Sequence, residues 1–321
     1  MAASPIQDDQ PYRCSGSIMG HKRKPHITKA AVMKFGLRYC NIGRYTDPAL
    51  TVELVQAGEE AGFDSAWCIE HTVVPGGYES RYPYAEDGRL PGKESEFVLP
   101  DPLIWMAFVA STTRRIKLGT AVLILPQHNP VITAKQVATI DHLSGGRVLL
   151  GIGVGWLKEE FDAIGAPFAA RGRRADEYVA AMRELWSSDA PTFHGEFVNF
   201  DKAYCLPQPV NKSVPIIIGG DSKPAARRAG RLGDGYFPAR GAQLELIDLA
   251  RRTAQAHDRD ADAIEITTSL PDDLEEIPAL AKHGISRLVV PASAGAGPRA
   301  VIQTPEDALK FKDVIERFAG V

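Results

Sequence analysis

Apolar and polar positions alternate regularly between strand-like and helix-like segments from Met33 onward. Short apolar runs bounded by glycine, proline or polar residues are typical of buried parallel strands, whereas apolar residues three and four positions apart are typical of helices. This pattern predicts eight strands, at residues 34–39, 63–69, 116–122, 147–152, 214–218, 236–237, 264–268 and 285–290.

Helices are predicted between these strands. One begins at Pro48, carries apolar residues on one face through Ala61 and ends at Gly62, as expected for proline at a helix start and glycine just after a helix end. A small polar hairpin is expected around His194 to Phe200. The other helices are predicted at residues 102–112, 130–143, 156–163, 170–187, 222–232, 242–257, 272–282 and 305–318.

The alternation of strands and helices predicts an α/β fold with a parallel sheet, and eight repeats are the number that closes into a (β/α)8 TIM barrel. An open doubly wound sheet is the alternative. That fold normally carries a G-x-G-x-x-G turn after its first strand, and residues 39–43 do not contain one. The barrel is therefore the predicted architecture.

Two regions are predicted along the chain. Residues 1–32 are polar, contain the basic cluster His21–Lys24 and lack the apolar core of a signal peptide, so we expect a disordered N-terminal extension. An upstream assignment of the start codon is an alternative explanation, because Met33 directly precedes the first strand. Residues 33–321 are expected to form the barrel domain.

The segment from Thr72 to Pro102 is too long for a simple connection after the second strand. Because it follows the C-terminal end of a strand, we expect it to lie over the barrel mouth as a lid that closes on ligand. An inert surface insertion is the alternative. The lid interpretation rests on its aromatic and cationic residues, which are Tyr78, Arg81, Tyr82, Tyr84, Arg89, Lys93 and Phe97.

Composition limits the possible partners. The formal charge of −3 and the isoelectric point near 6.3 do not favour nucleic acid or a membrane surface. The four cysteines lie far apart without a C-x-x-C pair, which favours buried thiols in a reducing cytoplasm. Apolar runs are shorter than the roughly 20 residues that span a bilayer, and no H-E-x-x-H or Cys/His cluster predicts a metal site.

The second predicted strand ends in Glu70 and His71, at the face where barrel enzymes place their catalytic groups. A histidine at this position can donate or accept a proton near neutral pH. A structural imidazole with satisfied hydrogen bonds is the commoner role of a single histidine. Its place at a strand end makes His71 a candidate catalytic residue.

Small residues at strand ends allow backbone N–H groups to approach a flat or anionic ligand. Residues 119–126 and 151–156 both have this character, although tight packing at the barrel neck is an alternative for the second segment. The turn Gly219–Ser222 joins an apolar strand to a helix, which favours a phosphate site. Asp221 would oppose an anion there, so helix capping is the alternative for Asp221 and Ser222.

In this order the segments resemble the bacterial luciferase-like superfamily of flavin and deazaflavin enzymes. The resemblance extends from Met33 to about Gly241, and the remaining third is similar only in its strand–helix rhythm. The tyrosine-rich insertion and Arg173-Arg174 resemble the actinobacterial branch predicted to use coenzyme F420. The motifs are Ala61–Asp64, Glu70–His71, Leu118–Val122, Ala134–Arg147, Gly151–Trp156, Glu159–Phe161, Arg171–Arg174 and Ile218–Gly235.

The resemblance implies a cofactor site at the barrel mouth. The peptide Ala121–Val122 matches a non-prolyl cis bond that bulges beneath the cofactor ring. The phosphate loop of the family matches four residues, Gly219, Gly220, Asp221 and Ser222. Gly153 and Gly155 are assigned to the same cofactor site, and Trp156 is expected to form a wall beside the ring or the substrate.

The resemblance also implies catalytic roles. His71 matches a histidine thought to assist proton movement in deazaflavin enzymes, and Glu70 replaces its usual acidic neighbour. Trp156 stands where the sugar-phosphate dehydrogenase branch has a catalytic glutamate, which argues against that branch's substrate. Glu159 or Glu160 is a possible substitute as general acid.

Three functions are therefore considered. The first is a coenzyme F420-dependent oxidoreductase that moves a hydride between the bound deazaflavin and a small organic substrate. The second is an FMN-dependent monooxygenase that uses reduced flavin and O2. The third is a barrel that binds a ligand without catalysis, for which Trp156 is the only support. A homodimer is also expected from the resemblance.

Overall fold

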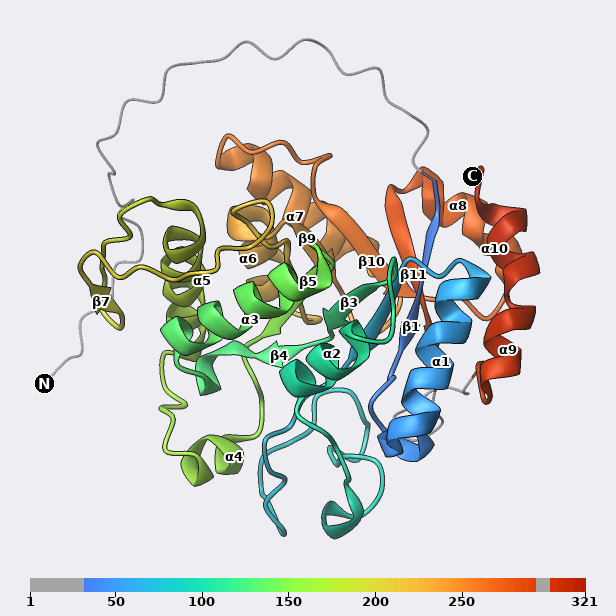
Figure 1. Cartoon of the computed structure of the whole chain (residues 1–321), viewed down its shortest axis with the longest axis horizontal. Coiled ribbons are helices and arrows are strands. Elements are labelled where there is room, and N and C mark those ends of the chain that lie inside the picture. The colour runs from blue at the N-terminus through green and yellow to red at the C-terminus, as the bar shows by residue number, and fades with distance from the viewer. Residues whose placement is uncertain (1–31, 293–300) are drawn as a thin grey trace, which may run out of the picture. The chain divides into compact units, whose positions relative to one another are not determined.

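Parallel strands form a closed ring at the centre of the computed structural model, which describes residues 32–292 and 301–321 (Figure 1). The order is β3-β2-β1-β11-β10-β9-β8-β5, and β3 also pairs with β5 and closes the barrel. The predicted fold is therefore confirmed. The barrel strands are β1 (Lys34–Arg38), β2 (Ser65–Cys68), β3 (Lys117–Thr120), β5 (Val148–Gly153), β8 (Ile216–Gly219), β9 (Gly235–Phe237), β10 (Glu265–Ser269) and β11 (Ile285–Pro291).

Two further features complete the strands. The short strand β4 (Leu123–Ile124) continues β3 after an interruption and pairs with β5. Strands β6 (Phe193–His194) and β7 (Asn199–Phe200) form the predicted antiparallel hairpin outside the barrel. The predicted disordered extension lies outside the described residues, except for Val32, and stays a prediction.

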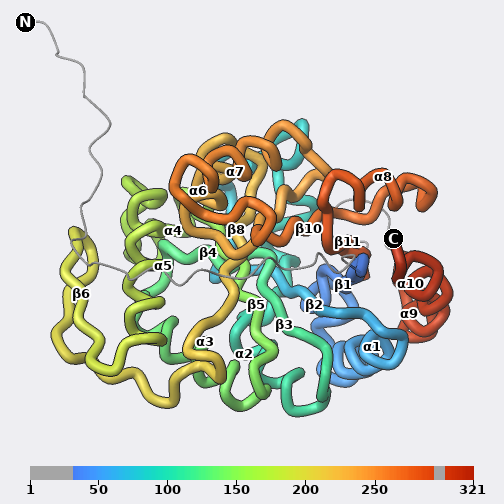
Figure 2. Tube along the Cα trace, turned by 90° about the horizontal axis from the view of Figure 1, so that it is seen from above, coloured from blue at the N-terminus to red at the C-terminus, as the bar shows by residue number. Residues whose placement is uncertain are grey.

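Helices surround the strands, as the view from above shows (Figure 2). The prediction over 272–282 was too long, because a 3-10 turn at Leu274–Glu276 precedes the helix, and the last predicted helix is divided at Phe311. The helices are α1 (Pro48–Ala61), α2 (Pro102–Ala110), α3 (Pro130–Ser144), α4 (Lys158–Ala163), α5 (Arg171–Ser187), α6 (Lys223–Leu232), α7 (Leu244–Ala256), α8 (Ile277–Lys282), α9 (Pro305–Lys310) and α10 (Lys312–Phe318).

The first three helices begin with the same kind of N-cap, an Asp or Asn side chain followed by proline. Asp47, Asp101 and Asn129 each accept hydrogen bonds from two backbone N–H groups of the following turn. A proline stands directly after each cap, where its missing N–H costs no hydrogen bond. These local signals explain why the starts of the three helices lie where the sequence predicts them.

A separate cluster of side chains fills the inside of the barrel. Trp67 is fully buried there, and its Nε1 donates to the Ser65 hydroxyl at 2.9 Å. Glycines on the neighbouring strands provide its space, because a Cβ on Gly36 or Gly119 would lie within 2.8 Å of the indole. The rest of this inner cluster consists of Ala121, Leu149, Ile217, Phe237 and Val289.

The N-terminal ends of the strands carry a network of paired charges. The Arg287 guanidinium is fully buried and donates to Asp64 at 2.8 Å and to Glu265. Lys34 also pairs with Glu265, and Lys117 lies 3.5 Å from Asp64. Burial alone would raise the pKa of both carboxyl groups, but Arg287 and the lysines lower it below the ordinary value.

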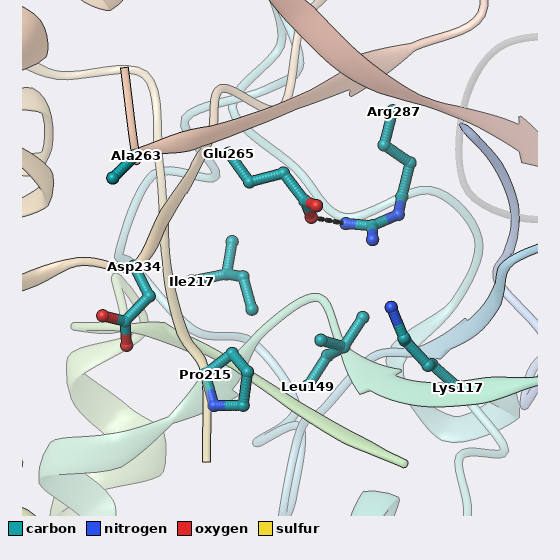
Figure 3. Close-up of a pocket in the computed structure, with 8 residues that line it drawn as sticks. All are labelled: Lys117, Leu149, Pro215, Ile217, Asp234, Ala263, Glu265 and Arg287. Carbon is teal, nitrogen blue, oxygen red and sulfur yellow. Dashed lines mark hydrogen bonds and ion pairs between the residues drawn. The ribbon is translucent and has the colours of Figure 1, made fainter. Parts of the chain in front are cut away.

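A cavity of about 230 Å³ opens at this same end of the barrel (Figure 3). Arg287 and Lys117 lie on one side of it and Asp234 on the other, with Leu149 and Ile217 between them. Asp234 accepts from Arg183 at 2.8 Å and from the backbone N–H of Ile216 at 2.9 Å. The charged side chains that line this cavity therefore have partners within the protein.

Two features concern the wider setting of the barrel. Cys40, Cys68 and Cys205 are buried free thiols. Of the helices in the described ranges, none combines the length and apolar character needed to cross a membrane.

Candidate active site

Glu70 and His71 follow β2 and turn toward different parts of the barrel mouth. The Glu70 carboxylate is buried, accepts from the backbone N–H of Ile124, and contacts His128 Nε2 at 2.7 Å. Burial alone would lower the pKa of His128, but the Glu70 carboxylate raises it above the ordinary value. Glu70 therefore connects the end of β2 to the segment that follows β4.

His71 is positioned by a second glutamate. Its Nδ1 lies 2.9 Å from Glu160 Oε2, and Glu160, on α4, is fully buried. The other oxygen of Glu160 accepts from the backbone N–H groups of Thr72 at 2.6 Å and Val73 at 3.3 Å. A carboxylate beside Nδ1 favours a proton on that nitrogen, so Nε2 is the atom available for acid–base chemistry.

Glu159, the other suggested general acid, faces the lid. Its Oε1 accepts from the backbone N–H groups of Glu79 at 2.8 Å and Ser80 at 3.1 Å. Although desolvation raises the pKa of Glu159, hydrogen bonds from Ser80 and the backbone lower it to about 2. A carboxyl group with this pKa is ionised at neutral pH, so Glu159 does not suit the role of an acid.

The backbone is kinked between β3 and β4. The peptide Ala121–Val122 is cis, which confirms the geometry that the resemblance implied. The Val122 side chain packs against two glycines of neighbouring strands. A Cβ on Gly153 would lie 2.5 Å from one Val122 methyl group, and a Cβ on Gly219 would lie 2.4 Å from the other.

These contacts give Gly153 of β5 a packing role, the alternative that the sequence left open, and the same holds for its neighbours in and after the strand. A Cβ on Gly151 would lie 1.8 Å from the Thr120 carbonyl oxygen, and one on Gly155 would lie 2.7 Å from Phe161. These distances support the packing interpretation of the glycines. Direct contact of Gly153 or Gly155 with a cofactor stays a prediction.

In the turn between β8 and α6, helix capping was the alternative role for both Asp221 and Ser222, and it holds for Ser222 only. Ser222 caps α6 by accepting from the Ala225 N–H at 3.2 Å. Asp221 does not cap. Its buried carboxylate accepts from the Ala239 N–H at 2.5 Å and from Arg240 Nε at 2.9 Å, so it ties this turn to the one after β9.

The loop between β2 and α2 folds back on itself through Tyr78. This buried tyrosine accepts from the Leu90 N–H at 2.7 Å, and the Arg89 guanidinium lies 4.8 Å from its ring centre. In Figure 1 the loop protrudes between α4 and α1.

Aromatic contacts carry the loop across several strand ends. The Trp156 ring, which follows β5, lies 5.9 Å from His71, 5.5 Å from Tyr78 and 5.2 Å from Tyr82. Tyr84 lies 6.0 Å from the Arg240 guanidinium, which follows β9. The loop therefore extends from β2 past β5 to the region after β9, as expected for a cover of the mouth.

Sequence reasoning missed three residues of the mouth, which are Arg38, His128 and Arg240. It also missed the pairing of Glu160 with His71. Arg38 is the last residue of β1, and its guanidinium lies 5.0 Å from the Phe237 ring inside the barrel mouth. Strand alternation was the available signal, because Gly36 faces Trp67 inside the barrel and residue 38 shares that face. In residues 32–292 and 301–321, no group of three His, Cys, Asp or Glu side chains is arranged for a metal ion.

Fold and site together define a parallel (β/α)8 barrel with acid–base, aromatic and glycine-rich elements at its C-terminal mouth. The model of the family described as luciferase-like monooxygenase matches residues 32–307. The chain belongs to this luciferase-like monooxygenase family.

Two individual proteins are similar to this chain. An uncharacterised protein of Mycobacterium tuberculosis is 35% identical over 187 residues, which are 58% of this chain and 65% of that relative, so the match spans less than two thirds of its length. The F420-dependent glucose-6-phosphate dehydrogenase of Kineococcus radiotolerans is 29% identical over 275 residues, covering 83% of this chain and 76% of that protein.

One solved structure shows the shared fold. It is an F420-dependent secondary alcohol dehydrogenase in complex with an F420–acetone adduct, with a TM-score of 0.69 and 20% sequence identity. The comparison covers 90% of this chain and 99% of that one.

Proposed function

We propose that this chain is a coenzyme F420-dependent oxidoreductase that transfers a hydride between the deazaflavin and a small organic substrate at the barrel mouth. The observation that carries the proposal is the His71 ring at the end of β2, which is held by the buried Glu160 carboxylate and lies beside the Trp156 ring. The similarity to the F420-dependent dehydrogenase of Kineococcus radiotolerans supports the choice of coenzyme.

The turn before α6 fits the phosphate of such a coenzyme. The backbone N–H groups of Asp221 and Ser222 have no acceptor among the described residues, and they lie at a helix N-terminus. Lys223, the first residue of α6, adds a positive charge. Arg240 neutralises the Asp221 carboxylate, which removes the repulsion that this residue would otherwise exert on an anion.

The coenzyme supplies the hydride chemistry when bound, and the residues of the chain supply orientation and proton handling. His71 Nε2 is assigned to donate or accept a proton at the reacting oxygen of the substrate. Glu160 is a positioning residue, because it acts through the His71 ring. Glu70, whose two oxygens already bind His128 and the Ile124 N–H, is assigned to support the mouth rather than to react.

Titration with each coenzyme tests the proposal. Trp156 is a suitable reporter, because Trp67, Trp105 and Trp186 are buried whereas Trp156 is partly exposed. We expect coenzyme F420 to quench the fluorescence at lower concentration than FMN. Lys223→Gln should weaken binding of coenzymes that carry a phosphate, whereas the matched variant Lys282→Gln on α8 should not.

The competing function is an FMN-dependent monooxygenase, which the family description favours. Tight binding of FMN without a response to F420, together with O2 consumption by protein supplied with reduced FMN, would replace the proposal by this alternative. Binding of F420 without turnover of a panel of alcohols and carbonyl compounds would favour a barrel that only binds its ligand.

A further inference from the structure

Arg38 is a cation at the barrel mouth without a carboxylate partner in the described part of the chain. Its guanidinium carbon lies 4.5 Å from the Tyr39 ring centre and 5.0 Å from that of Phe237. Nη1 makes only long contacts, 3.4 Å to the Ala239 carbonyl oxygen and 3.5 Å to the Ser269 hydroxyl. Nε is buried and has no acceptor there.

Three carboxylates of the mouth already have an arginine or imidazole partner. Their pairs are Asp221–Arg240, Glu70–His128 and Glu160–His71. A guanidinium that is partly buried without an anion loses hydration that its neighbours do not fully replace. Stacking on two aromatic rings recovers part of this free energy, but it leaves the N–H groups of Arg38 without strong acceptors.

The lid places neutral hydroxyl groups near this arginine. Tyr82 packs against Tyr84 at 5.4 Å, and Tyr84 lies 6.0 Å from the guanidinium of Arg240, whose neighbour Ala239 accepts from Arg38 Nη1. Burial raises the pKa of each phenol to about 12, so both keep their O–H proton at neutral pH. Phenol O–H groups and a guanidinium are suitable donors for a carboxylate.

We infer that Arg38 determines substrate specificity by binding a carboxylate of the organic substrate, which therefore belongs to the class of aromatic or apolar carboxylic acids. The planar guanidinium matches the two oxygens of a carboxylate, and the partly exposed Trp156 ring, which contacts Tyr82 of the lid, suits an apolar body. This inference rests on the proposed function, in which the turn at Gly219–Ser222 takes the coenzyme phosphate.

Binding of benzoate to the coenzyme-free protein, compared with its neutral isostere benzamide, tests the inference by calorimetry or ligand-observed NMR. We expect benzoate to bind at least about tenfold more tightly than benzamide, since hydrogen bonds to charged groups carry this preference. Arg38→Met should remove the preference, and Arg38→Lys should keep part of it. Arg317→Met is the matched control, because Arg317 also stacks on an aromatic ring but lies on α10.

Thermal unfolding of each variant shows whether the folded state is preserved, and Arg38→Lys tests the inference if Arg38→Met does not fold. Equal binding of benzoate to wild type and Arg38→Met, or equal binding of benzoate and benzamide to wild type, would overturn the inference. Loss of F420 binding in Arg38→Met with benzoate binding unchanged would assign Arg38 to the coenzyme instead. Arg38-dependent benzoate binding in a protein that binds neither coenzyme would refute the proposed function alone.

Discussion

Each end of the barrel has one arginine beside an aromatic ring inside the sheet. The two arginines differ in whether a carboxylate of the protein balances their charge. Arg287, at the N-terminal ends, lies 5.5 Å from the Trp67 ring and is bound by Asp64 and Glu265. Arg38, at the C-terminal ends, lies 5.0 Å from Phe237 and has no carboxylate partner in the described ranges.

This difference separates stability from function. Where the strands begin, the charges satisfy one another and the cavity of Figure 3 is lined by groups that mostly have protein partners. Where the strands end, Arg38, His71 Nε2 and the N–H groups before α6 keep hydrogen-bonding capacity that residues 32–292 and 301–321 do not use. Barrel enzymes use their C-terminal face for chemistry, and the charges of this chain follow the same division.

Removing the paired arginine should have the largest effect. Arg287→Met leaves Asp64 and Glu265 without their central partner, so we expect the free energy of unfolding to fall by about 3 kcal/mol or more. Chemical denaturation measures this change. Arg317→Met removes an exposed pair with Glu275 and should change stability by less than about 1 kcal/mol.

A result in which these two variants lose equal stability would contradict the comparison between the barrel ends. So would a loss of several kcal/mol in Arg38→Met, because an arginine without a carboxylate partner should contribute little to folding.

Substitution of His71 should lower turnover more than substitution of Glu160. His71→Ala should lower kcat/KM about 10²- to 10⁴-fold, as expected for loss of a proton-transfer group. Glu160→Gln should lower it less, since glutamine can still contact Nδ1 but no longer fixes the same tautomer. Chemical rescue separates the two variants: added imidazole should restore part of the activity of His71→Ala and none of the activity lost in Glu160→Gln.

If His71→Ala retains wild-type kcat/KM, the proton-transfer role is wrong. If Glu160→Gln loses activity only in proportion to a loss of stability on thermal unfolding, Glu160 serves the local fold and does not orient His71.

A change in the packing between Gly153 and Val122 should have a smaller effect on stability than the loss of Arg287. Gly153→Ala would place a Cβ 2.5 Å from a Val122 methyl group, and overpacking of this kind costs about 1–3 kcal/mol. The double variant Val122→Ala/Gly153→Ala removes that methyl group and should recover part of the stability. Gly76→Ala, which meets nothing within 4 Å, is the control. Additive losses in the double variant would show that Gly153 is not there to accommodate Val122.

The sequence predicted the elements better than the contacts between them. Apolar runs and caps such as Asp47-Pro48 are local signals, and they located the strands and most helix starts. The resemblance located the cis peptide at Ala121–Val122. Local patterns do not encode that Glu160 reaches His71 across 89 positions, because such a pair forms only when the barrel brings β2 and the segment after β5 together.

The smallest expected effect is an acid-dependent loss of stability at the paired end. The pKa values of Asp64 and Glu265 are lowered in the folded protein from ordinary values of 3.8 and 4.5. Lowered carboxyl pKa values add stability above the unfolded values, and this stability is lost as the pH falls through the folded values. The melting temperature should therefore fall below about pH 4.5 more steeply in wild type than in Arg287→Met. Parallel pH curves would show that the remaining lysines, Lys34 and Lys117, are sufficient to keep both carboxylates ionised, and that the arginine contributes through packing on Trp67 rather than through its charge.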